Sequence, residues 1–196
     1  TQDHSLFIKG LGFDIQSVTN PLSNEELKWS GEKMILIPSL ISESLDRDSV
    51  ISWLAKPNKD REFGIVSLVP GFSRKQQYEK IGARVATTND IFEIVKSLKD
   101  GHYSNAVVFA NRYDGIDLPD NACRILILDS KPYFDSLLDR YEEDCRSESD
   151  IMNIRIAHKV EQGLGRSVRG EKDYSIIVLV GGDLIKFAKS PLTSKY

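Results

Sequence analysis

Short, nearly continuous runs of hydrophobic residues recur along the chain and alternate with more polar segments. Five such runs, most of them rich in β-branched residues, stand at 34–40, 65–69, 106–110, 124–128 and 175–180. A continuous run, unlike an alternating one, is typical of a strand that is buried on both faces. The runs therefore predict interior strands of a sheet that is covered by helices on both sides.

The segments between these runs repeat hydrophobic residues with helical spacing. In 90–98 the hydrophobic residues stand three and four positions apart, which places them on one face of a helix. Similar patterns predict helices at 46–55, at 74–81 with Ser73 as the N-cap, at 133–141 and at 152–160. Strands that alternate with helices predict an α/β fold, a three-layer α/β/α arrangement around a mostly parallel sheet of about six strands.

The composition is that of a globular protein. Of 196 residues, 40% are hydrophobic and 28% are charged, and the net charge is −3. That charge excludes a protein that is basic all over, but it leaves room for a local basic stripe. We expect residues 1–33 to be a turn-rich lead-in and residues 34–196 to complete a single domain.

Cysteine and histidine give no sign of a metal site. Cys123 and Cys145 are 22 residues apart and the three histidines are scattered, so we expect neither bound zinc nor a disulfide framework. Few cysteines suit a reducing compartment, and we expect a cytoplasmic protein. The hydrophobic runs are too short to span a membrane, so we expect no membrane partner.

Ligands of parallel sheets bind beyond the carboxyl ends of the strands, and the loop after the run at 106–110 is unusual. Asp114 and Asp117 flank Gly115, where the backbone can turn sharply. Asp117 could accept a hydrogen bond from a sugar hydroxyl or hold a cation. An ordinary polar turn explains the same residues, because Asp and Gly are common in turns.

A second unusual segment, 162–170, precedes the last hydrophobic run. Arg166 and Arg169 are three residues apart, so on one helical face both guanidinium groups could meet one anion. The alternative is a pair of surface arginines that bond to neighbouring carboxylates.

A third segment, 70–75, follows the run at 65–69. It offers glycine, an aromatic ring and two cations that could grip a nucleic-acid backbone, and it reads equally well as an ordinary loop. The chain has no GxxxxGK[ST] phosphate loop and no GxSxG elbow, and no GxGxxG follows a strand.

Taken together, these segments resemble superfamily 2 helicases. Gln162-x-x-Gly165-Arg166-x-x-Arg169 is similar to their motif VI, QxxGRxxR. Gly115-Ile116-Asp117 resembles motif V, and the loop to Arg74 stands where motif IV belongs. The sequences GLGF at 10–13 and NPL at 20–22 resemble the start of the C-terminal lobe in the XPD/DinG branch.

The resemblance implies the RecA-like second lobe of an ATP-dependent helicase or translocase. In that family ATP and Mg²⁺ are bound mainly by the first lobe, which carries the phosphate loop and acidic motif that these residues lack. We therefore expect the chain alone to be inactive as an ATP hydrolase, and its partners to be an N-terminal helicase lobe and single-stranded or duplex nucleic acid. Asp114, where many members have Arg, points to DNA more than to RNA.

The resemblance also implies the roles of individual residues. The expected catalytic residues are Arg166, Arg169 and Gln162, and the expected nucleotide-binding residues are Gly115, Asp117 and Gly165. The expected nucleic-acid contacts are Gly71, Phe72, Ser73, Arg74, Asn111, Arg112 and Tyr113. We expect both motif VI arginines at the carboxyl edge of the sheet. The alternative function is a free-standing α/β module that binds a phosphate ligand or a protein without motor activity.

Overall fold

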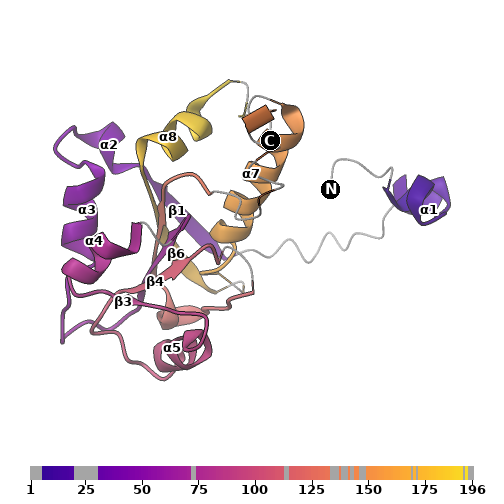
Figure 1. The fold of residues 1–196 in the computed structure, drawn as a ribbon. Helices are drawn as coiled ribbons and strands as arrows, with labels where there is room; N and C mark the ends of the chain where they lie inside the picture. The colour runs from indigo at the N-terminus through magenta and orange to yellow at the C-terminus, as the bar shows by residue number, and fades with distance from the viewer. Residues whose placement is uncertain are drawn as a thin grey trace.

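A computed structural model of the chain contains a six-stranded sheet with helices packed on both faces (Figure 1). The structure describes residues 6–19, 31–71, 74–112, 115–132, 137, 141, 144–145, 149–168, 170, 172–191 and 193.

All of the strand pairings are parallel, as the hydrophobic pattern predicts. The strands are β1 (Glu32–Leu36), β2 (Ile65–Val69), β3 (Arg84–Val85), β4 (Val107–Ala110), β5 (Ile125–Asp129) and β6 (Tyr174–Val180). Their order in the sheet is β1-β6-β5-β2-β4-β3. The predicted α/β/α fold with a parallel sheet is confirmed, and the two-residue edge strand β3 is an addition that no hydrophobic run indicated.

Helices precede, connect and follow these strands along the chain. They are η1 (Leu6–Gly10), α1 (Ile15–Thr19), α2 (Pro38–Ile41), α3 (Arg47–Leu54), α4 (Lys75–Lys80), α5 (Ile91–Lys99), η4 (Asp120–Ala122), α7 (Asp150–Leu164) and α8 (Gly182–Lys189). The predictions at 46–55, 90–98 and 152–160 are confirmed by α3, α5 and α7, whereas most of 133–141 lies outside the described residues. No described helix has the length and apolar character needed to cross a membrane.

Residues of the central strands alternate between two hydrophobic clusters, one on each face of the sheet. In β2, Val66 and Leu68 pack into the cluster that α5 and α8 cover. Ile65 and Val69 pack into the cluster that α3 and α4 cover. Because neighbouring side chains of a strand point to opposite faces, burial on both faces produces the continuous hydrophobic run seen in the sequence.

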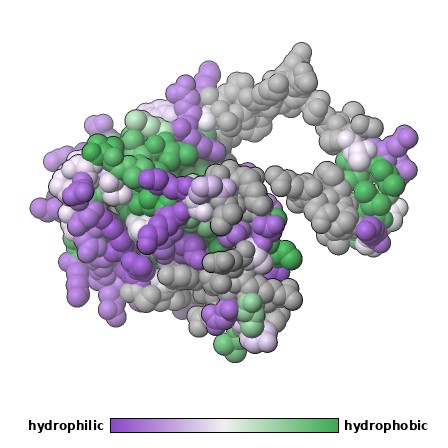
Figure 2. Space-filling view, turned by 90° about the horizontal axis from the view of Figure 1, so that it is seen from above, coloured by the Kyte–Doolittle hydropathy of each residue, from purple (hydrophilic) through white to green (hydrophobic). Residues whose placement is uncertain are grey.

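The first strand departs from the prediction. The run 34–40 is not one buried strand, because β1 ends at Leu36 and Pro38 opens α2. Proline suits the first turn of a helix, where its missing N–H costs nothing. Since β1 lies at the sheet edge, its residues are largely exposed, with Met34 at 57% and Ile35 at 51%. Figure 2, which views the molecule from above, shows hydrophobic surface on the side where α2 lies.

The N-cap that the sequence predicted for the helix at 74–81, which is α4, is also corrected. Arg74, not Ser73, occupies the N-cap position of α4, and its side chain makes no capping hydrogen bond. The Arg74 N–H donates to the Gly71 carbonyl across 3.4 Å. Ser73 itself lies outside the described residues.

A buried ion pair joins the end of β5 to the helices of one face. Asp129 is wholly buried and accepts two hydrogen bonds from Arg47, Nε to Oδ1 and Nη2 to Oδ2, each 2.6 Å long. The Tyr78 hydroxyl donates to Oδ2 across 3.1 Å, and the Ser130 hydroxyl donates to Oδ1 across 2.9 Å. This network therefore fixes α3 and α4 against the carboxyl end of the sheet.

The network also shifts the pKa values of Arg47 and Tyr78. Burial lowers the pKa of Arg47, but the hydrogen bonds and negative charge of Asp129 outweigh that effect and raise the pKa above its usual value. Burial, reinforced by the charge of Asp129, raises the pKa of Tyr78 well above its ordinary range. The tyrosine therefore remains a hydrogen-bond donor throughout the physiological pH range.

Replacing Arg47 should be costly, because the change leaves a carboxylate buried without its cation. We expect Arg47→Met, which retains the hydrophobic stem, to lower the free energy of unfolding by about 3 kcal/mol in urea denaturation. Glu79→Gln is the control, because it breaks only the exposed Lys75–Glu79 pair of 3.7 Å and should cost less than about 0.5 kcal/mol. Equal losses for the two variants would contradict the importance of the buried pair.

Candidate functional site

The segments that resemble motifs V and VI lie against each other. Hydrogen bonds join them: the Leu118 N–H donates to the Arg166 carbonyl across 3.3 Å, and Arg166 Nη1 donates to the Ile116 carbonyl across 3.2 Å. Ile116 and Leu118 are buried in the core cluster beneath α5, while Asp117 between them is exposed. The core therefore anchors the segment on both sides of Asp117 and leaves that carboxylate at the surface beside Arg166.

The end of α7 delivers Arg166 to this position. The helix stops at Leu164, and Gly165 is its C-cap, with a backbone N–H that donates to the Glu161 carbonyl across 3.1 Å. Arg166 thus follows the helix and is partly exposed. Gln162 is exposed on the last helical turn. Arg169 lies outside the described residues.

Arg166 does not lie at the carboxyl edge of the sheet, and that expectation is wrong. In a parallel sheet, α7 must run from the carboxyl end of β5 back to the amino end of β6. The segment after α7 accordingly lies at the amino edge. A Cβ added to Gly31, just before β1, would meet Val168 Cγ1 at 2.6 Å. The crossover direction, which motif spacing does not reveal, determines this placement.

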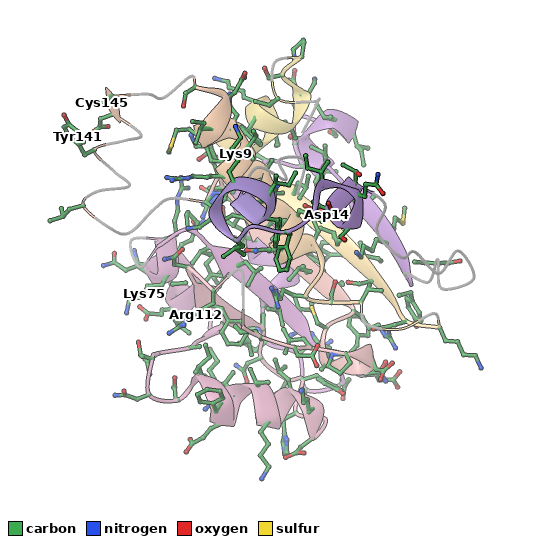
Figure 3. All side chains as sticks on the ribbon, turned by 90° about the vertical axis from the view of Figure 1, so that its right-hand side faces the viewer. Lys9, Asp14, Lys75, Arg112, Tyr141 and Cys145 are labelled. Carbon is green, nitrogen blue, oxygen red and sulfur yellow. The ribbon has the colours of Figure 1, made fainter. Side chains whose placement is uncertain are left out.

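Four of the residues expected to contact nucleic acid, Gly71, Arg74, Asn111 and Arg112, follow strands β2 and β4 at the carboxyl edge of the sheet. Strands β2 and β4 are neighbours, and the Asn111 N–H donates to the Val69 carbonyl across 2.8 Å. Gly71 and Arg74 after β2 therefore lie near Asn111 and Arg112 after β4. Figure 3 labels Lys75 and Arg112, whose side chains occupy neighbouring positions in that view. Phe72, Ser73, Tyr113 and Asp114 lie outside the described residues.

The sequence analysis did not predict a groove that lies beside Arg112. It separates α5 from the segment after β4 and exposes Phe92 on its α5 side. The pattern at 90–98 identifies the buried stripe of α5, and Phe92 stands outside that stripe. An aromatic residue outside a buried stripe was the sequence signal that could have indicated a binding site here.

Comparisons with known proteins identify the family of the chain. The helicase C-terminal domain family matches residues 54–185, which is more than half of the chain. The chain therefore belongs to the helicase C-terminal domain family.

The fold also matches a solved structure of an XPD helicase, with a TM-score of 0.55 and 14% sequence identity. That match covers 87% of this chain and 34% of the XPD helicase chain, so this chain spans about a third of that relative's length. No curated protein matches the sequence.

Gly115 of the motif V segment has a left-handed backbone conformation. Its φ is +72°, which is unfavourable for residues that have a Cβ, although no atom lies within 4 Å of an added Cβ. We expect Gly115→Ala to lower the free energy of unfolding by about 1 kcal/mol through backbone strain alone. Gly71→Ala is the matched control, because Gly71 has similar space and no positive φ, and it should be neutral or slightly stabilising. Urea denaturation compares the two variants, and equal effects would argue against backbone strain at Gly115.

Proposed function

We propose that this chain is the second motor lobe of an ATP-dependent nucleic-acid helicase or translocase, and that it acts on ATP bound at its interface with a first lobe. The observation that carries the proposal is the hydrogen-bonded contact of Arg166 with segment 116–118, found in a member of the helicase C-terminal domain family.

The side chains at this contact are chemically suited to a nucleotide. A guanidinium group binds phosphate oxygens through a planar fork of N–H donors and keeps its charge. The bond to the Ile116 carbonyl fixes the direction of the Arg166 side chain. Gln162 could add an amide donor, and the Asp117 carboxylate could accept from a ribose hydroxyl.

The lobe does not supply the whole nucleotide site. Phosphoryl transfer requires a phosphate cradle and a bound Mg²⁺, and the sequence has no phosphate loop. Within the described ranges, no group of three acidic, histidine or cysteine side chains could hold a metal ion. In the proposed protein the first lobe therefore binds ATP and Mg²⁺, and this lobe contributes Arg166 and Arg169 when the two lobes close.

The segment after β4 gives a physical basis for coupling hydrolysis to movement. It leaves the carboxyl edge at Asn111 and Arg112 and reaches Arg166 through Ile116 and Leu118. A shift of Arg166 toward a transferring phosphoryl group would therefore displace the segment after β4. The other end of that segment lies among the proposed nucleic-acid contacts. Those contacts are to the strand backbone, DNA in preference to RNA, through Arg74, Arg112 and their neighbours.

The motif VI arginines should affect hydrolysis more than ATP binding. In the full-length protein, we expect Arg169→Ala to lower kcat by about 10³-fold or more, because the charge acts mainly on the transition state. Arg166→Ala should have a similar effect, and Arg169→Lys should restore little, since lysine lacks the planar fork. Steady-state hydrolysis measures kcat, and nucleotide titration measures the affinity for ATP.

A matched control is Arg84→Ala, which removes an exposed arginine of β3 and should leave kcat and ATP affinity near the wild-type values. A loss of ATP affinity with unchanged kcat in the motif VI variants would contradict the transition-state role.

The carboxyl-edge cations should account for part of the salt dependence of strand binding. In the full-length protein, replacing Arg74 and Arg112 by Ala should weaken binding to a single strand and reduce the slope of log K against log salt by about 0.7 for each lost phosphate contact. Fluorescence anisotropy titrations at several salt concentrations measure this slope. Lys56→Ala, an exposed cation after α3, should change neither value. An unchanged slope for the Arg74 and Arg112 variants would place the strand elsewhere.

A further inference from the structure

A groove of about 610 Å³ runs between α5 and the segment that follows β4. Its lining comprises Thr88, Ile91, Phe92, Val95 and Lys99 on one side, and Arg112, Gly115, Ile116 and Asp117 on the other. Volumes of this size are typical of sites for small ligands or single groups of a larger one. The groove combines a hydrophobic floor with cations.

The α5 side of the groove presents an aromatic ring to solvent. Phe92, Val95 and Lys99 are spaced three and four residues apart, so they lie along one side of the helix. The core anchors α5 through Ile91, Ile94 and Leu98, which are buried, and Val95 packs partly against the same cluster, so the Phe92 ring lies outside the packed face of the helix. Phe92 is 83% exposed, and its ring is thus available for a ligand.

The opposite side of the groove connects it to the proposed strand path. Arg112 lines the groove and also belongs to the carboxyl-edge cluster that faces the end of β2. Gly115 has no side chain to narrow the groove. A single strand bound by its phosphates at Arg74 and Arg112 would therefore have a nucleotide beside this opening.

We infer that this groove is a nucleotide subsite for single-stranded nucleic acid, in which a base stacks on Phe92 while Lys99 and Arg112 attract the flanking phosphates. The inference rests on the proposed function. The groove offers a group for each part of the nucleotide: the aromatic face of Phe92 for the base, and the cations Lys99 and Arg112 for the phosphates. Asp117 contributes an opposite charge, which can accept from a sugar hydroxyl or a base amino group but would repel a phosphate. The phosphates therefore lie toward the two cations.

Stacking suits a motor that moves along any sequence. Every base has a π face, so an aromatic platform binds all four without reading hydrogen-bonding edges. Base stacking at Phe92 thus adds affinity to the backbone contacts without adding sequence preference.

The test compares two single strands of equal length and charge. The first is a dT oligonucleotide of about 20 nucleotides and the second is its abasic equivalent, both fluorescently labelled and titrated with the full-length protein. Phe92→Ala should weaken dT binding by about 5- to 100-fold and abasic binding by less than about twofold. Its salt slope should match that of the wild type, because no charge is lost.

The variants Phe92→Trp and Trp53→Ala complete the design. Tryptophan retains a stacking surface, so Phe92→Trp should bind dT within about threefold of the wild type. Trp53 is an aromatic residue of similar exposure, 78%, on α3, on the other face of the sheet, and its loss should have no effect. In addition, quenching of a 2-aminopurine base in the strand should be present in the wild type and absent in Phe92→Ala.

Each outcome separates this inference from the proposed function. Equal losses on dT and abasic strands would mean that Phe92 packs against the first lobe rather than a base, and would overturn the inference. Unchanged dT binding by Phe92→Ala, in a protein whose wild type binds dT and hydrolyses ATP in response, would overturn the subsite alone. A wild-type protein that binds neither strand and hydrolyses no ATP would overturn both.

Discussion

The contact between Arg166 and the segment 116–118 is the interaction on which the rest of the site depends. Its geometry follows from the parallel sheet, which requires each crossover helix to return its chain to the amino edge. The segment after β4 and the end of α7 both cross the same face in that direction, so two motifs that lie far apart in sequence meet there. Their hydrogen bonds are modest, but the buried Ile116 and Leu118 hold the segment in place.

The carboxyl ends and the amino ends of the strands thus carry different proposed contacts, the first with nucleic acid and the second with a nucleotide. The carboxyl edge carries Arg74 and Arg112, while the contact that involves Arg166 lies toward the amino edge. On the opposite face, the buried pair of Arg47 and Asp129 joins α3 and α4 to the end of β5. The proposed nucleotide contact and the proposed strand contacts therefore lie at opposite ends of the strands.

The sequence predicted the class of fold and the family, and it failed where tertiary geometry decides. Runs such as 65–69 reveal central strands, because burial on both faces leaves no polar positions. The same reasoning misjudged β1, since a hydrophobic run carries no sign that its strand lies at an edge. Motif spacing located Arg166 on the end of a helix but not at the amino edge, because the direction of the crossover is a property of the whole sheet. The partnership of Arg47 with Asp129, 82 positions away, likewise depends on a contact that no local pattern encodes. Phe92, outside the buried stripe of α5, was a local sign of the groove, but the opposite wall of the groove comes from the segment after β4.

The central claim is that this lobe brings cationic side chains to ATP held by a first lobe. The most direct measurement is a structure of the full-length protein with a non-hydrolysable ATP analogue and a single strand. The account predicts a guanidinium N–H of Arg166 or Arg169 within about 2.7–3.2 Å of a γ-phosphate oxygen, with Ile116 and Leu118 still beside Arg166. A nucleotide bound between closed lobes, with both guanidinium groups directed away from its phosphates, would contradict the claim.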